Sequence, residues 1–131
     1  MIYCLGYEAE YSTPGLPEKS ITTLDKASSK GTVKKFKRKE NIKLKIPHMG
    51  WNKVIQKNDH PIWYNIKNES YFYFVHSYFV EPMDKSYVIG ETVYGDTFSS
   101  IIAKDNIVAI QGHPEKSSST GLQFLKNFID I

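Results

Sequence analysis

The chain has 131 residues, a formal net charge of +3, 40% hydrophobic residues and 14% aromatic residues. This composition excludes wholesale disorder and fits a single domain or part of one. Cys4 is the only cysteine, which excludes an intramolecular disulfide framework.

The hydropathy pattern also excludes a membrane span. The longest apolar run, from Tyr71 to Val80, is interrupted by His76 and Ser77 and is far shorter than the roughly 20 residues that cross a bilayer. The N-terminus lacks the basic and long apolar segments of a signal peptide. We therefore expect a cytoplasmic protein with no membrane partner.

The first half of the chain predicts short strands. A cluster of Ser, Thr, Pro and Gly between Ser12 and Pro17 breaks regular structure. Residues 32–36 predict a short strand, and residues 43–46 predict another, in which polar and apolar side chains alternate. Pro47 and Gly50 predict a turn or bulge, and residues 51–56 resume an extended pattern.

The second half is richer in strands. Residues 62–66 predict one short helix, and Ser70 to Val80 predict the strongest strand, with a composition typical of a strand covered on both faces. Residues 87–94, 98–103 and 106–111 predict three further strands.

The C-terminal segment, residues 120–131, predicts an amphipathic helix with Ser119 or Thr120 as its N-cap. Its expected apolar face consists of Leu122, Leu125, Phe128 and Ile129. Many strands and one strong helix indicate an α+β or mixed α/β fold whose sheet needs more cover than one helix supplies. We therefore expect residues 1–131 to form a single, partial domain.

Positive charge is concentrated between Lys30 and Lys45, where eight Lys or Arg side chains accompany one Glu. Such a stretch either holds phosphates or is a solvated strand and loop, and the second interpretation is favoured. No P-loop, zinc-ligand spacing or RNA-binding aromatic motif accompanies it. We predict no nucleic-acid partner, no metal and no cofactor.

His113-Pro114-Glu115 follows the last predicted strand. A histidine at the end of a buried strand, with a carboxylate two residues later, is suited to general base catalysis because the carboxylate orients the imidazole. Taken alone, the motif is also compatible with a structural turn that carries a surface Glu.

Cys4 has two interpretations as well. Followed by Leu5-Gly6, it fits a nucleophile on a tight strand-to-helix turn, and its partners His113 and Glu115 would meet it in space. The alternative is a lone buried cysteine that packs as a small hydrophobe.

Two further motifs stand out. His76-Ser77-Tyr78 places three hydrogen-bonding side chains in an apolar strand, which indicates either satisfied core groups or a strand end that opens onto a pocket. Residues 47–52 place Trp, Met and His beside a glycine turn, which resembles an interface anchor more than a metal site.

Taken together, these motifs resemble class I glutamine amidotransferases, and most closely the glutaminase subunits of imidazole glycerol phosphate synthase. The matching segments, in chain order, are Cys4-Leu5-Gly6, Pro47-His48-Met49-Gly50-Trp51-Asn52, His76-Ser77-Tyr78, His113-Pro114-Glu115-Lys116-Ser117 and Gly121-Leu122 with Leu125, Asn127 and Phe128. The resemblance implies an α/β fold: the C-terminal part of a flavodoxin-like three-layer domain, strand-rich, with a C-terminal amphipathic helix.

The resemblance implies a catalytic set. Cys4 would attack the side-chain amide of glutamine, His113 would act as base and acid, and Glu115 would orient His113. Ser77 and Tyr78 match positions near the bound glutamine.

It also implies a partner. Ammonia would pass through a tunnel to a (β/α)8-barrel cyclase subunit that makes imidazole glycerol phosphate in histidine biosynthesis. The side chains at the subunit interface would be Pro47, His48, Met49 and Trp51.

Three departures from the family affect the expected activity. The chain begins three residues before Cys4, so the family's first strands and its oxyanion-hole loop have no counterpart. The elbow differs, with Ile2, Tyr7 and Glu8 in place of Gly, Met and the glutamine-contacting Gln. Gly112 replaces a Phe. We therefore expect the isolated chain to aggregate or to need a partner, and to show negligible glutaminase turnover.

Three functional hypotheses follow. The first is a glutaminase subunit whose remaining part comes from another chain. The second is an inactive fragment that keeps only the partner-binding surface. The third is a related amidotransferase that supplies ammonia for the amidation of surface sugars.

Overall fold

The computed structural model describes residues 31–38, 40 and 43–131, together with the backbone of residues 2–4. Its strands are β1 (Ile2–Cys4), β2 (Gly31–Lys35), β3 (His48–Gln56), β4 (Ser70–His76), β5 (Tyr78–Pro82), β6 (Val88–Tyr94), β7 (Asp96–Lys104) and β8 (Ile107–Ile110). The helical segments are the 3-10 turns η1 (Pro61–Trp63), η2 (Lys85–Tyr87) and η3 (Pro114–Lys116), and the α-helix α3 (Ser118–Asp130).

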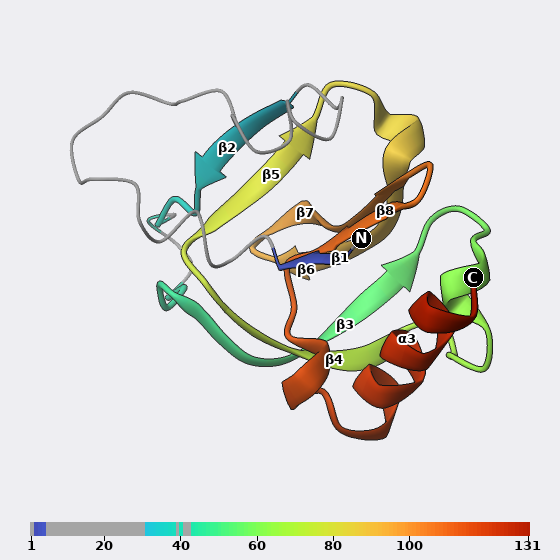
Figure 1. Cartoon of the computed structure of the whole chain (residues 1–131). Coiled ribbons are helices and arrows are strands. Elements are labelled where there is room, and N and C mark those ends of the chain that lie inside the picture. Colours follow the sequence, from blue (N-terminus) through green and yellow to red (C-terminus); the bar gives the residue numbers. More distant parts are fainter. Residues whose placement is uncertain (1, 5–30, 39, 41–42) are drawn as a thin grey trace.

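The described strands form one sheet in the order β1-β8-β7-β6-β3-β4, and β5 pairs with both β2 and β7 (Figure 1). β1 runs parallel to β8, whereas the other pairs are antiparallel. In Figure 1, α3 lies beside β4 at one end of the molecule, and the β2–β5 pair lies at the other. The predicted α/β fold, strand-rich with a C-terminal helix, is confirmed. In the described part of the chain, α3 is the one α-helix that covers the sheet.

The predicted long strand between Ser70 and Val80 is in fact two strands. The chain bends at Ser77, between β4 and β5, where the His76 ring Nδ1 lies 2.8 Å from the Tyr78 carbonyl oxygen. The β3–β4 ladder ends at His76, and beyond it the His76 side chain bonds the backbone of the bend. The prediction that both faces are covered also differs from the structure, because Phe72 and Phe74 are buried on one face while Tyr71 is exposed on the other.

The predicted strand over residues 43–46 is wrong: the described residues there are not part of the sheet, and the next strand begins at His48. Pro47 lacks the N–H that a ladder position needs. The Lys45 carbonyl instead accepts a hydrogen bond from the Tyr94 hydroxyl at 2.5 Å.

The C-terminal helix is confirmed, but its buried face agrees only in part with the predicted one, of which Phe128 packs against the core. Gly121, Phe124 and Asn127 are buried, whereas Leu122 and Ile129 are exposed. Phe124 packs edge-on against the rings of Trp63 and Phe72, at centroid distances of 6.3 and 5.8 Å. The amide of Asn127 donates to the carbonyl oxygens of Ile62 and Tyr64, at 2.7 and 2.6 Å.

The N-terminal boundary of α3 also differs, because the cap residue is Ser117 rather than Ser119 or Thr120. No helix in the described part of the chain is long and apolar enough to span a membrane. The short turn η3 lies directly before α3, and Gly121 in the first turn of α3 packs against Pro114 of η3.

Gly121 allows α3 to approach η3 closely. A Cβ atom added at Gly121 would lie 1.8 Å from the Pro114 carbonyl oxygen and 2.7 Å from its carbon. Both are backbone atoms, which cannot move aside as a side chain can. The helix is therefore held against the turn that contains Pro114 and Glu115.

We expect Gly121→Ala to destabilise the protein by about 1–3 kcal/mol or more, because overpacking against backbone forces the helix and turn apart. Thermal unfolding followed by circular dichroism measures this effect. Leu122→Ala, on the exposed face of the same helix turn, is the matched control and should change stability little. Equal stability of the two variants would contradict the packing described here.

Candidate active site

His113 is placed by the turn that follows β8. Its backbone N–H donates to the Tyr73 carbonyl oxygen on β4 at 2.9 Å, and its own carbonyl accepts from the Lys116 N–H at 3.0 Å. Pro114 occupies the first position of η3, where a missing N–H costs nothing. The turn is thus anchored to the neighbouring strand before the helix begins.

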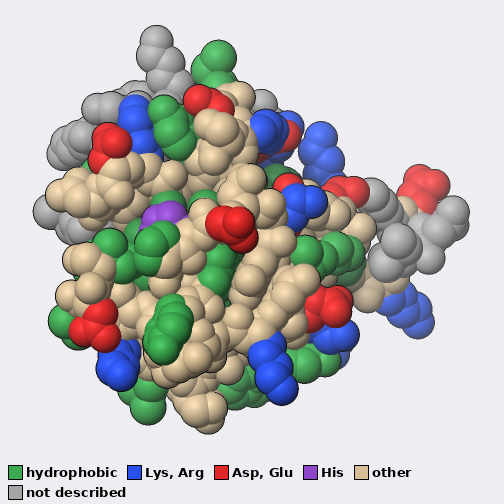
Figure 2. Space-filling view, turned by 90° about the vertical axis from the view of Figure 1, so that its right-hand side faces the viewer, with side chains coloured by type: hydrophobic (Ala, Val, Ile, Leu, Met, Phe, Trp, Pro, Cys, Tyr) green, Lys and Arg blue, Asp and Glu red, His purple; other side chains and the backbone are tan. Residues whose placement is uncertain are grey.

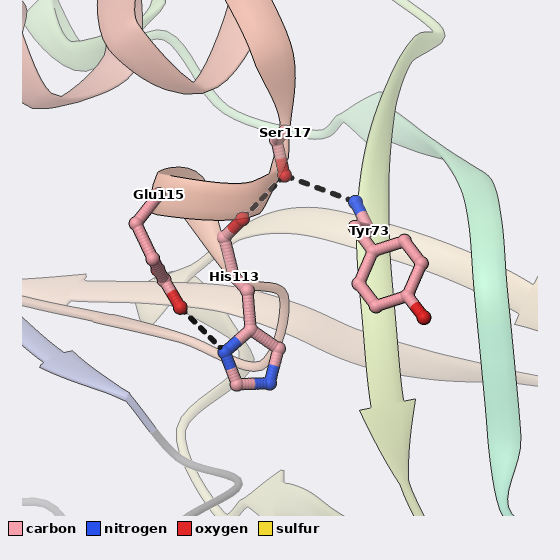
Figure 3. Close-up of polar contacts among 4 residues, drawn as sticks. All are labelled: Tyr73, His113, Glu115 and Ser117. Carbon is pink, nitrogen blue, oxygen red and sulfur yellow. Dashed lines mark hydrogen bonds and ion pairs between the residues drawn. The ribbon is translucent and has the colours of Figure 1, made fainter.

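The Ser117 hydroxyl fastens this turn a second time (Figure 3). It donates to the His113 carbonyl oxygen at 2.5 Å and accepts from the Tyr73 N–H at 3.0 Å. Ser117 is buried. Tyr73 therefore bonds the turn through both of its backbone polar groups.

The imidazole of His113 pairs with Glu115. Nδ1 of His113 lies 2.9 Å from a carboxylate oxygen of Glu115 (Figure 3), and the two side chains are 17% and 55% exposed. A carboxylate accepts hydrogen bonds, so Nδ1 carries the proton and Nε2 holds the lone pair. This arrangement suits a base that takes up a proton at Nε2 and becomes a cation stabilised by Glu115.

Cys4 is placed only by its backbone. It ends β1 and lies opposite Ile110, the last residue of the parallel strand β8. The carboxyl ends of β1 and β8 are therefore at the same edge of the sheet, with His113 three residues beyond Ile110. The Cys4 side chain and the whole of Glu8 lie outside the described residues, and so does the predicted meeting of Cys4 with His113 and Glu115.

Ser77 and Tyr78 lie where β4 passes into β5. The Ser77 carbonyl accepts from the Phe36 N–H at 3.1 Å, and the Tyr78 carbonyl faces the His76 ring. β4 connects this bend to the His113 turn. The Tyr73 carbonyl in β4 accepts the His113 N–H, and β4 ends at His76, directly before the bend.

The sequence motifs did not reveal that His48 and His76 contact each other. Their rings are joined by a 2.8 Å contact between Nδ1 of His48 and Nε2 of His76, and the residues are 2% and 0% exposed. The prediction that His48 faces a partner therefore differs from the structure. β3 alternates its side chains, and the position opposite His76 points inward.

Burial lowers the pKa of both histidines. It lowers the pKa of His48 to about 3, with a further contribution from the neighbouring His76. It lowers the pKa of His76 to about 4, opposed by the hydrogen bond to Tyr78 and assisted by the nearby His113. Both rings are neutral at pH 7.

The other predicted interface residues are at the surface. Pro47, Met49 and Trp51 are exposed, and the Trp51 ring meets the Tyr73 ring edge-on at 5.9 Å. Figure 2 shows one face of the molecule, where hydrophobic side chains are exposed in several groups with charged side chains around them. In the described ranges, no group of three or more His, Cys, Asp or Glu side chains is arranged to hold a metal ion.

Comparison with known proteins identifies the family. A sequence profile of the family described as "Glutamine amidotransferase class-I" matches residues 4–131. The chain belongs to this family.

Its curated relatives include proteins named imidazole glycerol phosphate synthase subunit HisH. That of Hydrogenovibrio crunogenus is 55% identical over 101 residues, which cover 77% of this chain and 47% of the relative. That of Methanocaldococcus jannaschii is 52% identical over 102 residues, which cover 78% and 50%. This chain thus spans about half the length of the curated relatives it matches.

A solved structure supports the fold. A Thermoplasma acidophilum protein described as a possible GMP synthase subunit matches with a TM-score of 0.59 at 19% sequence identity. The match covers 76% of this chain and 47% of that chain.

We expect Ser117→Ala to loosen the His113 turn. The Tyr73 N–H loses its acceptor, and an unsatisfied buried donor costs about 1–3 kcal/mol. Amide hydrogen exchange at Tyr73 should accelerate, while Ser119→Ala, at an exposed position of α3, should leave it unchanged. Ser117→Thr keeps the hydroxyl and should restore protection. Unchanged exchange at Tyr73 in Ser117→Ala would disprove the bridge.

We also expect acid to destabilise the fold through His48 and His76. Their folded pKa values of about 3 and 4 lie below the ordinary 6.5, so the unfolded chain binds protons that the folded chain does not. Stability is full above pH 6.5 and falls as the pH drops toward 4 and then 3. At pH 5 the loss is about 2 kcal/mol per histidine.

Urea unfolding at pH 7.5 and pH 5 measures this loss. His48→Gln and His76→Gln should each flatten the pH dependence, even though each variant also changes stability at pH 7.5. A pH dependence that is as steep in both variants as in the parent chain would contradict the assignment.

Proposed function

We propose that this chain contributes the nucleophile, the base and the orienting carboxylate of a glutaminase. In this proposal Cys4 is the nucleophile, His113 is the base and acid, and Glu115 orients His113. The substrate is the side-chain amide of glutamine, and the products are glutamate and ammonia. The observation that carries the proposal is the His113–Glu115 pair at the same sheet edge as the end of β1.

The chemistry follows from the lone pair that His113 holds on Nε2 when Nδ1 donates to Glu115. Nε2 takes the Cys4 thiol proton, and the thiolate attacks the amide carbon of glutamine. The carbon–nitrogen bond then breaks, and the imidazolium gives its proton to the leaving nitrogen, which departs as ammonia.

The γ-glutamyl thioester that remains is hydrolysed by the same base. His113 takes a proton from water, the resulting hydroxide attacks the thioester carbon, and the carbon–sulfur bond breaks. The imidazolium returns this proton to the sulfur, so that glutamate leaves and the cysteine thiol is restored. Glu115 stabilises the imidazolium in both halves of the cycle.

The substrate-binding proposal covers Glu8, Ser77 and Tyr78. Ser77 and Tyr78 lie at the bend between β4 and β5, and their hydroxyl groups can exchange hydrogen bonds with a bound glutamine. Glu8 stands where the resembling family has Gln, and a carboxylate close to a cysteine disfavours the thiolate.

The partner proposal rests on the exposed apolar side chains in and beside β3. Pro47, Met49 and Trp51 would contact a (β/α)8-barrel cyclase subunit that receives the ammonia for imidazole glycerol phosphate. The names of the relatives, subunits of imidazole glycerol phosphate synthase, support this assignment. The same residues also fit the alternative of a partner-binding fragment without turnover.

The sole cysteine gives a direct test of the triad. We expect Cys4 to react with iodoacetamide at a rate that depends on His113, because a neighbouring imidazolium lowers a thiol pKa from about 8.5. His113→Asn should slow alkylation at pH 7, and Glu115→Gln should slow it less. Glu8→Gln should accelerate it.

Mass spectrometry after timed quenching measures the rate, and His60→Asn is the matched histidine control. The same alkylation rate in His113→Asn as in the parent chain would remove His113 as the partner of Cys4.

Turnover separates the enzyme from the binding fragment. We expect negligible glutamate release from the isolated chain, because it spans about half the length of the curated relatives it matches and each missing oxyanion-hole donor costs about 2.7–4 kcal/mol of transition-state stabilisation. Release is measured with and without the cyclase partner, against Cys4→Ala. Turnover by the isolated chain that is lost in Cys4→Ala would show a working enzyme and contradict our expectation.

A further inference from the structure

A series of side-chain hydrogen bonds begins on β3, passes through the core to β4 and ends at the start of β5. The Asn52 amide nitrogen lies 3.2 Å from Nε2 of His48, and Nδ1 of His48 lies 2.8 Å from Nε2 of His76. Nδ1 of His76 then lies 2.8 Å from the Tyr78 carbonyl oxygen. Neither histidine is used in the glutaminase chemistry proposed above.

The groups at the two ends of this series determine which atom is the donor in each of its hydrogen bonds. The Tyr78 carbonyl only accepts, so His76 carries its proton on Nδ1 and offers the Nε2 lone pair. His48 must therefore donate from Nδ1, and its Nε2 accepts from the amide nitrogen of Asn52, which only donates. Each ring is neutral and has both nitrogens satisfied.

Aromatic rings enclose the pair. His48 is stacked between the rings of Phe74 and Tyr94, at centroid distances of 4.9 and 3.9 Å. Phe36 and Phe98 lie 5.1 and 5.0 Å from the His76 ring. In such apolar surroundings an imidazole nitrogen without a partner is costly, so each hydrogen bond enforces the next.

This series of hydrogen bonds ends at the backbone bend between β4 and β5. The His76 bond reaches past Ser77 to the Tyr78 carbonyl, while the Phe36 N–H holds the Ser77 carbonyl at 3.1 Å. Two independent bonds thus fix the bend between β4 and β5. The same β4 backbone bonds the His113 turn at Tyr73.

We propose that His76, oriented by His48 and Asn52, is a positioning residue that holds Ser77 and Tyr78 in the geometry needed to bind glutamine. The inference rests on the proposed function for the identity of the ligand. The hydrogen-bond chain and its hold on the bend are properties of the fold and are tested separately.

Two substitutions at His76 separate hydrogen bonding from space filling. An Asn amide reaches the position of Nδ1 and keeps the donor to the Tyr78 carbonyl. A Gln amide reaches the position of Nε2, keeps the contact with His48 and is closer to His in volume. If His76 positions the bend, His76→Asn is the better substitute, whereas if it only fills the core, His76→Gln is better.

The first readout is NMR of the full 131-residue chain. Ring ¹⁵N shifts should show the Nδ1–H tautomer at both His48 and His76. The amide shifts of Ser77 and Tyr78 should stay near the parent values in His76→Asn and move in His76→Gln. An Nε2–H tautomer at His76, or a bend better preserved in His76→Gln, overturns the proposal.

The second readout is glutamate release by the chain together with the cyclase partner. His76→Gln should raise KM for glutamine about five- to tenfold, the effect of one neutral hydrogen bond, and leave kcat nearly unchanged. His76→Asn should keep the parent KM, and Lys53→Gln, at an exposed position of β3, is the background control. A fall in kcat without a rise in KM overturns the positioning role.

The turnover readout and the NMR readout test different parts of the argument. Turnover that persists in Cys4→Ala, or no turnover by the parent chain in any assembly, defeats the proposed function. The tautomers and the amide shifts at the bend still decide whether His76 holds Ser77 and Tyr78 in place.

Discussion

The bridge between Tyr73 and the His113 turn is the constraint on which the rest of the site depends. The Tyr73 carbonyl accepts the His113 N–H, and the Ser117 hydroxyl links the Tyr73 N–H to the His113 carbonyl. A loop that leaves a strand usually gains freedom with each residue. Here the chain has advanced three residues beyond β8 and is held by a second strand, so the imidazole starts from a fixed backbone.

β4 therefore acts as a common frame for two regions. At its middle it bonds the turn that carries His113, and at its end it carries His76, whose ring fixes the bend at Ser77. The backbone of β4 is rigid because it pairs with β3 along seven residue pairs. Groups attached to the middle and to the end of β4 therefore keep a fixed distance from each other. The proposed base and the proposed substrate-binding residues are placed relative to each other through this backbone.

The sequence predicted what is local in the chain and missed what depends on register. The His113–Glu115 contact joins residues two apart and was visible in the motif. The His48–His76 contact joins residues 28 apart and exists because β3 and β4 pair at that position. The burial of Asn127 on α3 was also missed, because two carbonyl oxygens in and beside η1 accept from the Asn127 amide. Apolar periodicity does not register such a polar requirement.

The remaining part of the site depends on a very short ladder. β1 has three residues, and among the described strands it pairs only with β8, from Ile2 opposite Val108 to Cys4 opposite Ile110. A slip of one residue would move Cys4 by about 3.3 Å and turn its side chain to the opposite face of the sheet. His113, in contrast, is bonded to β4 at both ends of its turn. The two halves of the proposed nucleophile–base pair thus differ in how firmly the described residues hold them. It follows that any further strand pairing with the other edge of β1 would fix the backbone of the proposed nucleophile, whereas the turn that carries the proposed base is already held by β4.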